Sequence, residues 1–234
     1  MERRRAGKGV EERRRFLRAA ASVAGIALAS GAGKAACAAS GDHEAEGAEV
    51  TPGEDLMQEH GVLERILLVY DEAIARIEKK QSLDLAVVTK AAGIVRRFVE
   101  DYHERQEEEF VFPRLRSAQR EVELVATLLR QHERGRQLTD EIIRRSGSAA
   151  GPELAGMLRS FARMYRPHAA REDTVVFPAF RDVIGRAAYR DLGEQFEDKE
   201  HELFGEHGFE TVVGEVADLE RSLGIYDLAS FTPA

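Results

Sequence analysis

Two segments of the sequence repeat a pattern whose residue types suit metal binding. Residues 103–113 read HERQEEEFVFP, and residues 168–178 read HAAREDTVVFP. Each segment has a histidine, a glutamate four residues later and Phe-Pro at its end. In a helix, side chains at positions i and i+4 lie on one face, so each segment would point an imidazole and a carboxylate in the same direction. Mixed imidazole and carboxylate ligands are typical of transition-metal sites.

Four of the seven histidines interrupt stripes of apolar residues. Leu56 and Leu63 flank His60 at helical spacing, and the other three histidines have similar neighbours. At that spacing the imidazoles point into a core and not toward solvent. Two of them bring a glutamate, and a buried carboxylate is costly unless it is paired or bound to metal. The candidate metal ligands are therefore His60, His103, Glu107, His132, His168 and Glu172.

A simpler interpretation exists for each of these residues taken singly. One buried histidine is usually a hydrogen-bonded core residue, and an acidic run such as residues 107–109 is usually a solvated face. Four inward histidines, two with glutamates at the same spacing, favour a metal site over four unrelated core histidines. His43, His201 and His207 lack this context, and we expect them at the surface.

Apolar residues that recur every three or four positions predict the helices that position these ligands. Four long helices are expected at about residues 54–79, 83–112, 120–145 and 152–177. The Phe-Pro pairs are expected to end or bend the second and fourth helices beyond the site. Short connections between long helices predict an all-α fold, an up-down-up-down four-helix bundle over residues 54–187.

Residues 188–234 are expected to form a C-terminal extension outside the bundle. One or two further helices, broken around residues 205–208, should precede a short tail. This extension either caps the bundle or forms a dimer surface, so a homo-oligomer remains one of the open alternatives.

The charge distribution excludes some classes of protein and suggests export. The formal net charge of −8 argues against a nucleic-acid partner. The single cysteine excludes an intrachain disulfide and a cysteine-based zinc site. Residues 1–40 carry nine Lys or Arg and three Glu, a net of +6, so the rest of the chain carries −14. A basic segment followed by an apolar stretch and small residues is the plan of a signal peptide.

Within this leader, RRRFLR at residues 13–18 resembles the twin-arginine (Tat) export motif, although Glu12 stands where Ser or Thr is usual. The resemblance implies that the Tat export machinery carries the folded protein to a periplasmic or other extracytoplasmic location. Residues 41–53 are expected to be a flexible linker between leader and bundle. Lipid anchoring at Cys37 is an alternative to cleavage near residues 36–40, but Lys34 lies where that signal needs an apolar residue.

The ligand pattern resembles a known family. One histidine in the first and third helices, and His-x-x-x-Glu in the second and fourth, resemble hemerythrin-like (HHE cation-binding) domains over about residues 54–180. The resemblance implies a four-helix bundle with a non-haem di-iron centre. It assigns His60 and His103 to one iron, His132 and His168 to the other, and Glu107 and Glu172 as bridges. Manganese and zinc are the alternative metals.

One position departs from the oxygen-carrying members of that family. They have a fifth histidine four residues after the third-helix histidine, and this chain has Arg136 there. The departure implies an open or water-filled position on one iron, with Arg136 free to pair with a carboxylate of the site. Glu104 is an additional candidate ligand, or else a solvated glutamate. Tyr70 and Tyr102 are expected either near the site or in the ordinary core.

Three functions follow from the resemblance. The first is reversible binding of oxygen or nitric oxide for sensing, storage or scavenging. We favour it because no electron-transfer module is evident, although the lack of an output domain weakens a signalling role. The second is a di-iron oxidoreductase that acts on peroxide, oxygen or nitric oxide, which the open position favours. The third is a metal-storage protein or a structural metal site. The pattern leaves open whether the chain is an enzyme.

Overall fold

The structure is a computed structural model that describes residues 50–148 and 151–233. The predicted Tat signal peptide, Cys37, His43 and residues 41–49 of the predicted linker lie outside the described residues. Within them the fold is all-α, with no strand, as predicted. No described helix is both long enough and apolar enough to cross a membrane.

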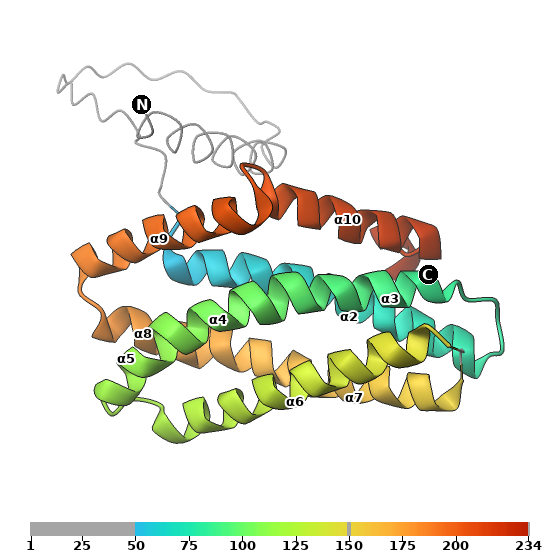
Figure 1. Cartoon of the computed structure of the whole chain (residues 1–234), viewed down its shortest axis with the longest axis horizontal. Coiled ribbons are helices and arrows are strands. Elements are labelled where there is room, and N and C mark those ends of the chain that lie inside the picture. The colour runs from blue at the N-terminus through green and yellow to red at the C-terminus, as the bar shows by residue number, and fades with distance from the viewer. Residues whose placement is uncertain (1–49, 149–150, 234) are drawn as a thin grey trace, which may run out of the picture. The chain divides into compact units, whose positions relative to one another are not determined.

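Four long helical rods form the bundle (Figure 1). The first rod is α2 (Pro52–Glu78) and the third is α6 (Val122–Ser146). The second rod runs from α3 (Leu85–Ile94) through α4 (Glu104–Gln106) to α5 (Phe112–Ser117). The fourth rod joins α7 (Pro152–Arg171) to α8 (Phe177–Val183). The first rod packs against the second and fourth, and the third rod packs against the same two, which is the up-down-up-down arrangement that short loops predict.

The first rod begins at Pro52, inside the segment that the sequence assigned to the linker. Thr51 caps it through a capping box: its hydroxyl accepts from the Glu54 amide at 3.3 Å, and the Glu54 carboxylate accepts from the Thr51 amide at 2.9 Å. Proline is well tolerated at the first helical position, because its missing N–H has no partner to lose there.

The second and fourth rods continue through the Phe-Pro pairs, so the predicted ends at residues 112 and 177 are wrong. A π-helical segment precedes each pair, at Glu107–Val111 and at Glu172–Val176. The Phe112 amide donates to the Glu107 carbonyl, and the Phe177 amide donates to the Glu172 carbonyl, five residues back in both cases. Each proline then lies in the first turn of a new α-helical segment, where it is tolerated, and the rods run on to Ser117 and Val183.

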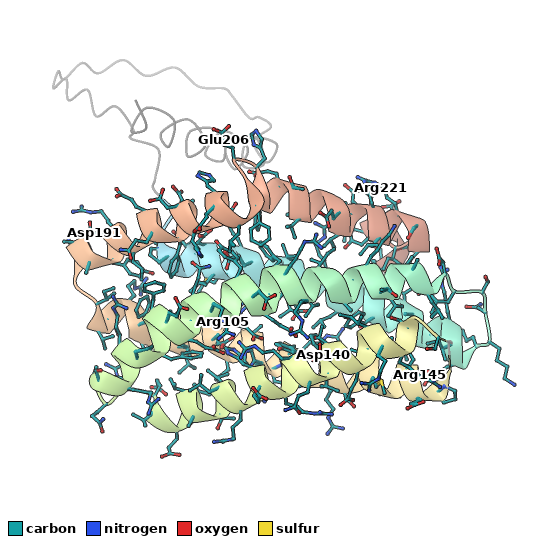
Figure 2. The ribbon with its side chains drawn as sticks, in the orientation of Figure 1. Arg105, Asp140, Arg145, Asp191, Glu206 and Arg221 are labelled. Atoms are coloured by element: carbon teal, nitrogen blue, oxygen red, sulfur yellow. The ribbon has the colours of Figure 1, made fainter. Side chains whose placement is uncertain are left out.

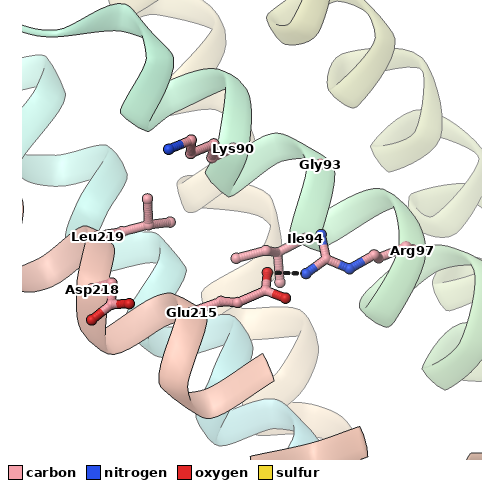
Figure 3. Close-up of a pocket in the computed structure, with 7 residues that line it drawn as sticks. All are labelled: Lys90, Gly93, Ile94, Arg97, Glu215, Asp218 and Leu219. Atoms are coloured by element: carbon pink, nitrogen blue, oxygen red, sulfur yellow. Dashed lines mark hydrogen bonds and ion pairs between the residues drawn. The ribbon is translucent and has the colours of Figure 1, made fainter. Parts of the chain in front are cut away.

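The predicted C-terminal helices are α9 (Arg186–Phe204) and α10 (Gly208–Leu223), joined at the predicted break near Gly205. Both pack on α2, and α10 also packs on α3. Ion pairs fasten α10 to the bundle: Arg97 pairs with Glu215 (Figure 3), and Arg65 with Glu220 at 2.5 Å. The outer side of these two helices is charged and exposed, with Asp191, Glu206 and Arg221 among its residues (Figure 2).

The apolar interior consists of two separate clusters. On each rod, the candidate histidine lies between members of the two clusters. On the first rod, for example, Leu56 belongs to the smaller cluster, Leu63 to the larger one, and His60 lies between them. The histidines therefore form a polar layer across the bundle that is closed by apolar packing on both sides.

Candidate metal centre

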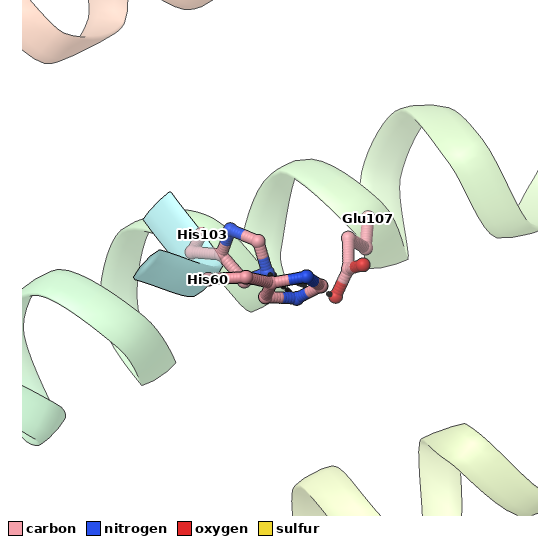
Figure 4. Close-up of side chains that lie close together, drawn as sticks. All are labelled: His60, His103 and Glu107. Atoms are coloured by element: carbon pink, nitrogen blue, oxygen red, sulfur yellow. Dashed lines mark hydrogen bonds and ion pairs between the residues drawn. The ribbon is translucent and has the colours of Figure 1, made fainter. Parts of the chain in front are cut away.

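The structure brings all six predicted ligands together in this buried layer. They form two groups, and within each group the ligand atoms lie within 4.8 Å of one another. Figure 4 shows the first group, in which the two imidazoles and the carboxylate converge from α2 and the second rod. None of the six side chains is more than 4 % exposed. The groups are His60, His103 and Glu107, and His132, His168 and Glu172.

Each of the four imidazoles has its Nδ1 atom against a hydrogen-bond acceptor from a neighbouring rod. The pairs are Glu59 with His103 at 2.7 Å, Glu108 with His132 at 3.0 Å, Gln131 with His168 at 2.9 Å and Asp173 with His60 at 2.7 Å. Each acceptor comes from the preceding rod, and Asp173 on the fourth rod returns to the first. Such partners fix the tautomer and the orientation of metal-binding histidines. We call these four acceptors the support ring.

The remaining ring nitrogens face one another in pairs. The Nε2 atoms of His60 and His103 are 3.0 Å apart, and those of His132 and His168 are 3.2 Å apart. A neutral imidazole that donates from Nδ1 has an unprotonated Nε2. Two lone pairs at this distance repel each other unless a proton or a metal cation lies between or beside them. The arrangement therefore fits a bound cation at each pair.

The two carboxylates span the two groups. Glu107 Oε2 lies 3.7 Å from His103 Nε2 and 3.5 Å from His132 Nε2. Glu172 Oε2 lies 3.0 Å from His168 Nε2 and 3.4 Å from His60 Nε2. None of the four carboxylate oxygens has a hydrogen-bond donor among the described residues. Buried carboxylates in that condition fit metal ligands, and their positions match those of bridges.

The buried carboxylates of this layer also favour bound positive charge. Burial raises the pKa of Glu107, and the nearby carboxylate of Glu172 raises it further. Burial also acts to raise the pKa of Glu172, but the imidazoles of His168 and His60 outweigh it and lower that pKa. Burial lowers the pKa of His60, yet the nearby carboxylates of Asp173 and Glu172 outweigh burial and raise it to about 9. With no metal bound, protons supply the positive charge that metal cations would otherwise bring.

Glu104 is buried and is not the solvated residue of the alternative interpretation. Its carboxylate accepts from the Tyr165 hydroxyl at 2.7 Å and pairs with Arg136 at 2.8 Å. Arg136 also pairs with Glu108 at 2.6 Å, so it pairs with carboxylates at the edge of the site, one of the roles considered for it. Glu104 and Glu108 lie close enough to His132 to form a third group of possible ligands.

Tyr165 has a place at this network that sequence reasoning missed, although it lies three residues before His168. A Cβ atom at Gly135 would stand 1.9 Å from the Tyr165 hydroxyl, so the glycine gives this side chain its room. Tyr70 and Tyr102, by contrast, belong to the larger apolar cluster. Tyr70 packs edge-on against Phe161 at 5.5 Å, in keeping with an ordinary core residue.

Sequence reasoning also missed the whole support ring. Every member directly adjoins a candidate ligand in the sequence: Glu59 precedes His60, Glu108 follows Glu107, Gln131 precedes His132 and Asp173 follows Glu172. A residue next to an inward ligand points about 100° away around the helix, toward the neighbouring rod. In the sequence pattern, such a position looks like part of a solvated helix face. The signal that could have identified these four residues is that each one adjoins a candidate ligand. Of the other histidines, His207 is exposed and His201 is half-buried.

The fold and the site together define a four-helix bundle with a buried cation-binding layer. Residues 51–180 match the hemerythrin HHE cation-binding domain family, and the chain belongs to that family. It is 45 % identical over 237 residues to the uncharacterized protein Rv1995 of Mycobacterium tuberculosis, covering 95 % of this chain and 91 % of that one. The uncharacterized protein Mb2018 of Mycobacterium bovis has the same identity and coverage. No solved structure matches the chain.

Proposed function

We propose that this chain is a non-haem di-iron protein. His60 and His103 ligate one iron, His132 and His168 ligate the other, and Glu107 and Glu172 bridge the two. The observation that carries the proposal is the pair of facing Nε2 atoms in each group, at 3.0 and 3.2 Å, with their Nδ1 atoms all engaged elsewhere. Two imidazoles and two carboxylate oxygens at each metal suit iron, with manganese and zinc as alternatives.

The proposed activity is binding of oxygen or nitric oxide, for sensing, storage or scavenging. Iron supplies the ligand-binding and redox chemistry when it is bound. The chain supplies enclosure, because apolar clusters close the layer on both sides and exclude water. It also leaves a coordination position free for a small ligand, because Arg136 stands where the oxygen carriers have a fifth histidine. Arg136 pairs with the carboxylates of Glu104 and Glu108 and does not act as a metal ligand.

The alternative is a di-iron oxidoreductase that acts on peroxide, oxygen or nitric oxide. One observation favours it specifically: the Tyr165 hydroxyl donates to buried Glu104, which lies beside His132. A tyrosine and a carboxylate in hydrogen-bond contact can deliver or accept a proton at the edge of the metal layer. A metal-storage or structural role is the third candidate.

The deciding experiment combines metal content with the visible spectrum. The purified chain is reduced without air, exposed to oxygen or nitric oxide, and then returned to the anaerobic state. Two irons per chain and an absorption band that appears and disappears over repeated cycles would support reversible binding. Two irons with consumption of peroxide and no lasting band would support the oxidoreductase. A folded chain with zinc, or with no metal, would overturn the di-iron proposal.

We also propose that the Tat machinery exports the protein to an extracytoplasmic location, with its cofactor already inserted. Support comes from the leader alone, where the arginines at positions 13 and 14 precede Phe16 and Leu17. A protein that gains its metals while folding in the cytoplasm would need a route that carries folded chains, and the Tat route does so.

A further inference from the structure

The four acceptors of the support ring mark the four seams between neighbouring rods, and they differ in exposure. The Glu59 side chain is 1 % exposed and that of Glu108 is 16 % exposed, whereas that of Asp173 is 34 % exposed. The apolar clusters close the layer along the bundle. A metal cation that enters the folded chain therefore has to pass one of these seams, and the charge that each seam presents determines how well it attracts the cation.

The seam between the first and second rods is covered by the C-terminal extension. Helix α9 packs on α2 of the first rod, and its Phe196 ring packs edge to face with Phe110 of the second rod at 5.7 Å. Glu59, the acceptor at this seam, therefore has almost no contact with solvent.

The next two seams present no carboxylate that is available to an entering cation. Between the second and third rods, Glu108 is paired with two cations, Arg136 at 2.6 Å and Arg105 at 3.1 Å. Between the third and fourth rods, the acceptor is the neutral amide of Gln131. A divalent cation gains little at either place, because the one carboxylate is already neutralised and the amide carries no charge.

The seam between the fourth and first rods is different, because its carboxylate faces solvent. Among the residues that the structure describes, Asp173 pairs with no arginine or lysine. Its partner is His60, whose positive charge is a proton that an entering metal displaces. Asp173 Oδ1 lies 2.7 Å from His60 Nδ1, and Oε2 of the next residue, Glu172, lies 3.4 Å from Nε2 of the same ring. The His60 ring therefore lies between a partly exposed carboxylate and a buried one.

The first rod has no side chain at one position beside this seam. Gly61 follows His60 and lies about 100° around the helix, on the side opposite Glu59 and so toward the fourth rod. It is exposed, and a Cβ atom there would meet nothing within 4 Å beyond its own stretch of helix. Glycine inside a helix is destabilising relative to alanine. The sequence thus keeps an open space beside His60 although the helix would be more stable without it.

We propose that the seam beside Asp173 is the port through which divalent metal cations enter the buried layer, with Asp173 as the first carboxylate that binds them. The cation then passes to Glu172, the adjacent residue and one of the candidate bridges. A carboxylate that faces solvent without an arginine or lysine partner raises the local concentration of cations at the entrance. This role rests on the proposed metal function and is additional to the orientation of His60 by Asp173.

The test measures how fast the purified, metal-free full chain takes up Co²⁺, followed by visible absorbance after rapid mixing. Asp173→Asn removes the charge but keeps an acceptor for His60, and it should slow uptake by about fivefold or more at low salt. The difference should shrink in about 1 M salt, where the Debye length is about 3 Å. Glu59→Gln makes the corresponding change at the covered seam, so it measures the support of an imidazole alone. Its uptake should be about fivefold or more faster than that of Asp173→Asn.

A second pair of variants tests the port without changing the support ring. Gly61→Lys places a cation and a long side chain beside the seam, and it should slow Co²⁺ uptake by about tenfold. Gly214→Lys is the matched control and should take up Co²⁺ at the parent rate. Gly214 is an exposed glycine of α10, and a Cβ atom there would also meet nothing within 4 Å beyond its own stretch of helix.

Two results would overturn the port. They are uptake by Asp173→Asn as fast as by Glu59→Gln, and uptake by Gly61→Lys as fast as by Gly214→Lys. The final Co²⁺ content of each chain separates this proposal from the metal function itself. A parent chain that holds no Co²⁺ at equilibrium refutes the metal layer and the port together, whereas loaded chains with equal uptake rates refute the port alone.

Discussion

Replacing Glu59 with leucine should weaken metal binding without removing a metal ligand. The Glu59 carboxylate accepts from His103 Nδ1 at 2.7 Å, and both side chains are almost fully buried. Losing such a support typically lowers metal affinity about 10–100-fold, which corresponds to about 1.4–2.7 kcal/mol. Leucine has a similar size, so the effect arises from the lost orientation and basicity of the imidazole and not from a cavity.

The assay is competition for metal with a chromophoric chelator, with folding checked by circular dichroism. Glu59→Gln retains an acceptor for Nδ1, so its loss should be smaller than that of Glu59→Leu. Glu64→Gln, an exposed position on the same helix, is the matched control and should bind metal as the parent does. A folded Glu59→Leu chain whose affinity stays within about twofold of the parent would refute the role of the support ring.

Four further predictions concern the same centre and the leader. Glu107→Ala or Glu172→Ala should lose metal and lower the Tm. With metal in hundredfold excess over Kd the shift should be about 5–10 °C, because about 2.7 kcal/mol of binding stabilisation disappears. Full metal retention in both variants would contradict the bridging assignment. His60, whose pKa rises from 6.5 to about 9 without metal, stabilises the metal-free fold below pH 6.5 and loses that contribution as pH rises through 9. Metal affinity should therefore increase with pH across this window, with proton release measurable by calorimetry in buffers of different ionisation enthalpy; a flat profile would contradict it. Gln131→Glu should raise metal affinity in the second group by up to about tenfold, measured by the same chelator competition, because a carboxylate makes the imidazole more basic; an unchanged affinity would contradict the role of that acceptor. Replacing both arginines at positions 13 and 14 with lysine should leave precursor in the cytoplasm, seen by fractionation, and normal export would contradict the Tat proposal.

The bundle and the meeting of the six candidate ligands in its core were predictable, because helical periodicity indicates which side of a rod faces inward. His60 between Leu56 and Leu63 is enough to place that imidazole in the core, and the same holds for the other three histidines. The continuation of two rods through Phe-Pro was not predictable from periodicity. It depends on the π-helical segments that begin at Glu107 and Glu172, whose carbonyls bond five residues ahead. A pattern of residue types does not reveal that change of backbone pairing.

The support ring was not predicted from the sequence, for a different reason. Its members contact imidazoles on other rods, at separations of 24 to 113 residues along the chain. The periodicity of apolar residues shows which side of its own helix a residue occupies, but it does not show which neighbouring helix the side chain contacts. Glu104 illustrates the same limit: its partners Arg136 and Tyr165 come from two different rods, so a glutamate that looked like surface or ligand became part of a buried network.

The support ring also makes the two proposed metal positions unequal. In the first group, both imidazoles rest on carboxylates, Glu59 and Asp173. In the second group, His168 rests on the neutral amide of Gln131, and the carboxylate that supports His132 is shared with the cation of Arg136. A carboxylate partner raises the basicity of an imidazole, whereas an amide or a nearby cation does not. Under the di-iron proposal, the first group should therefore bind its metal more tightly, and the second should be the position where a small ligand meets the less saturated ion.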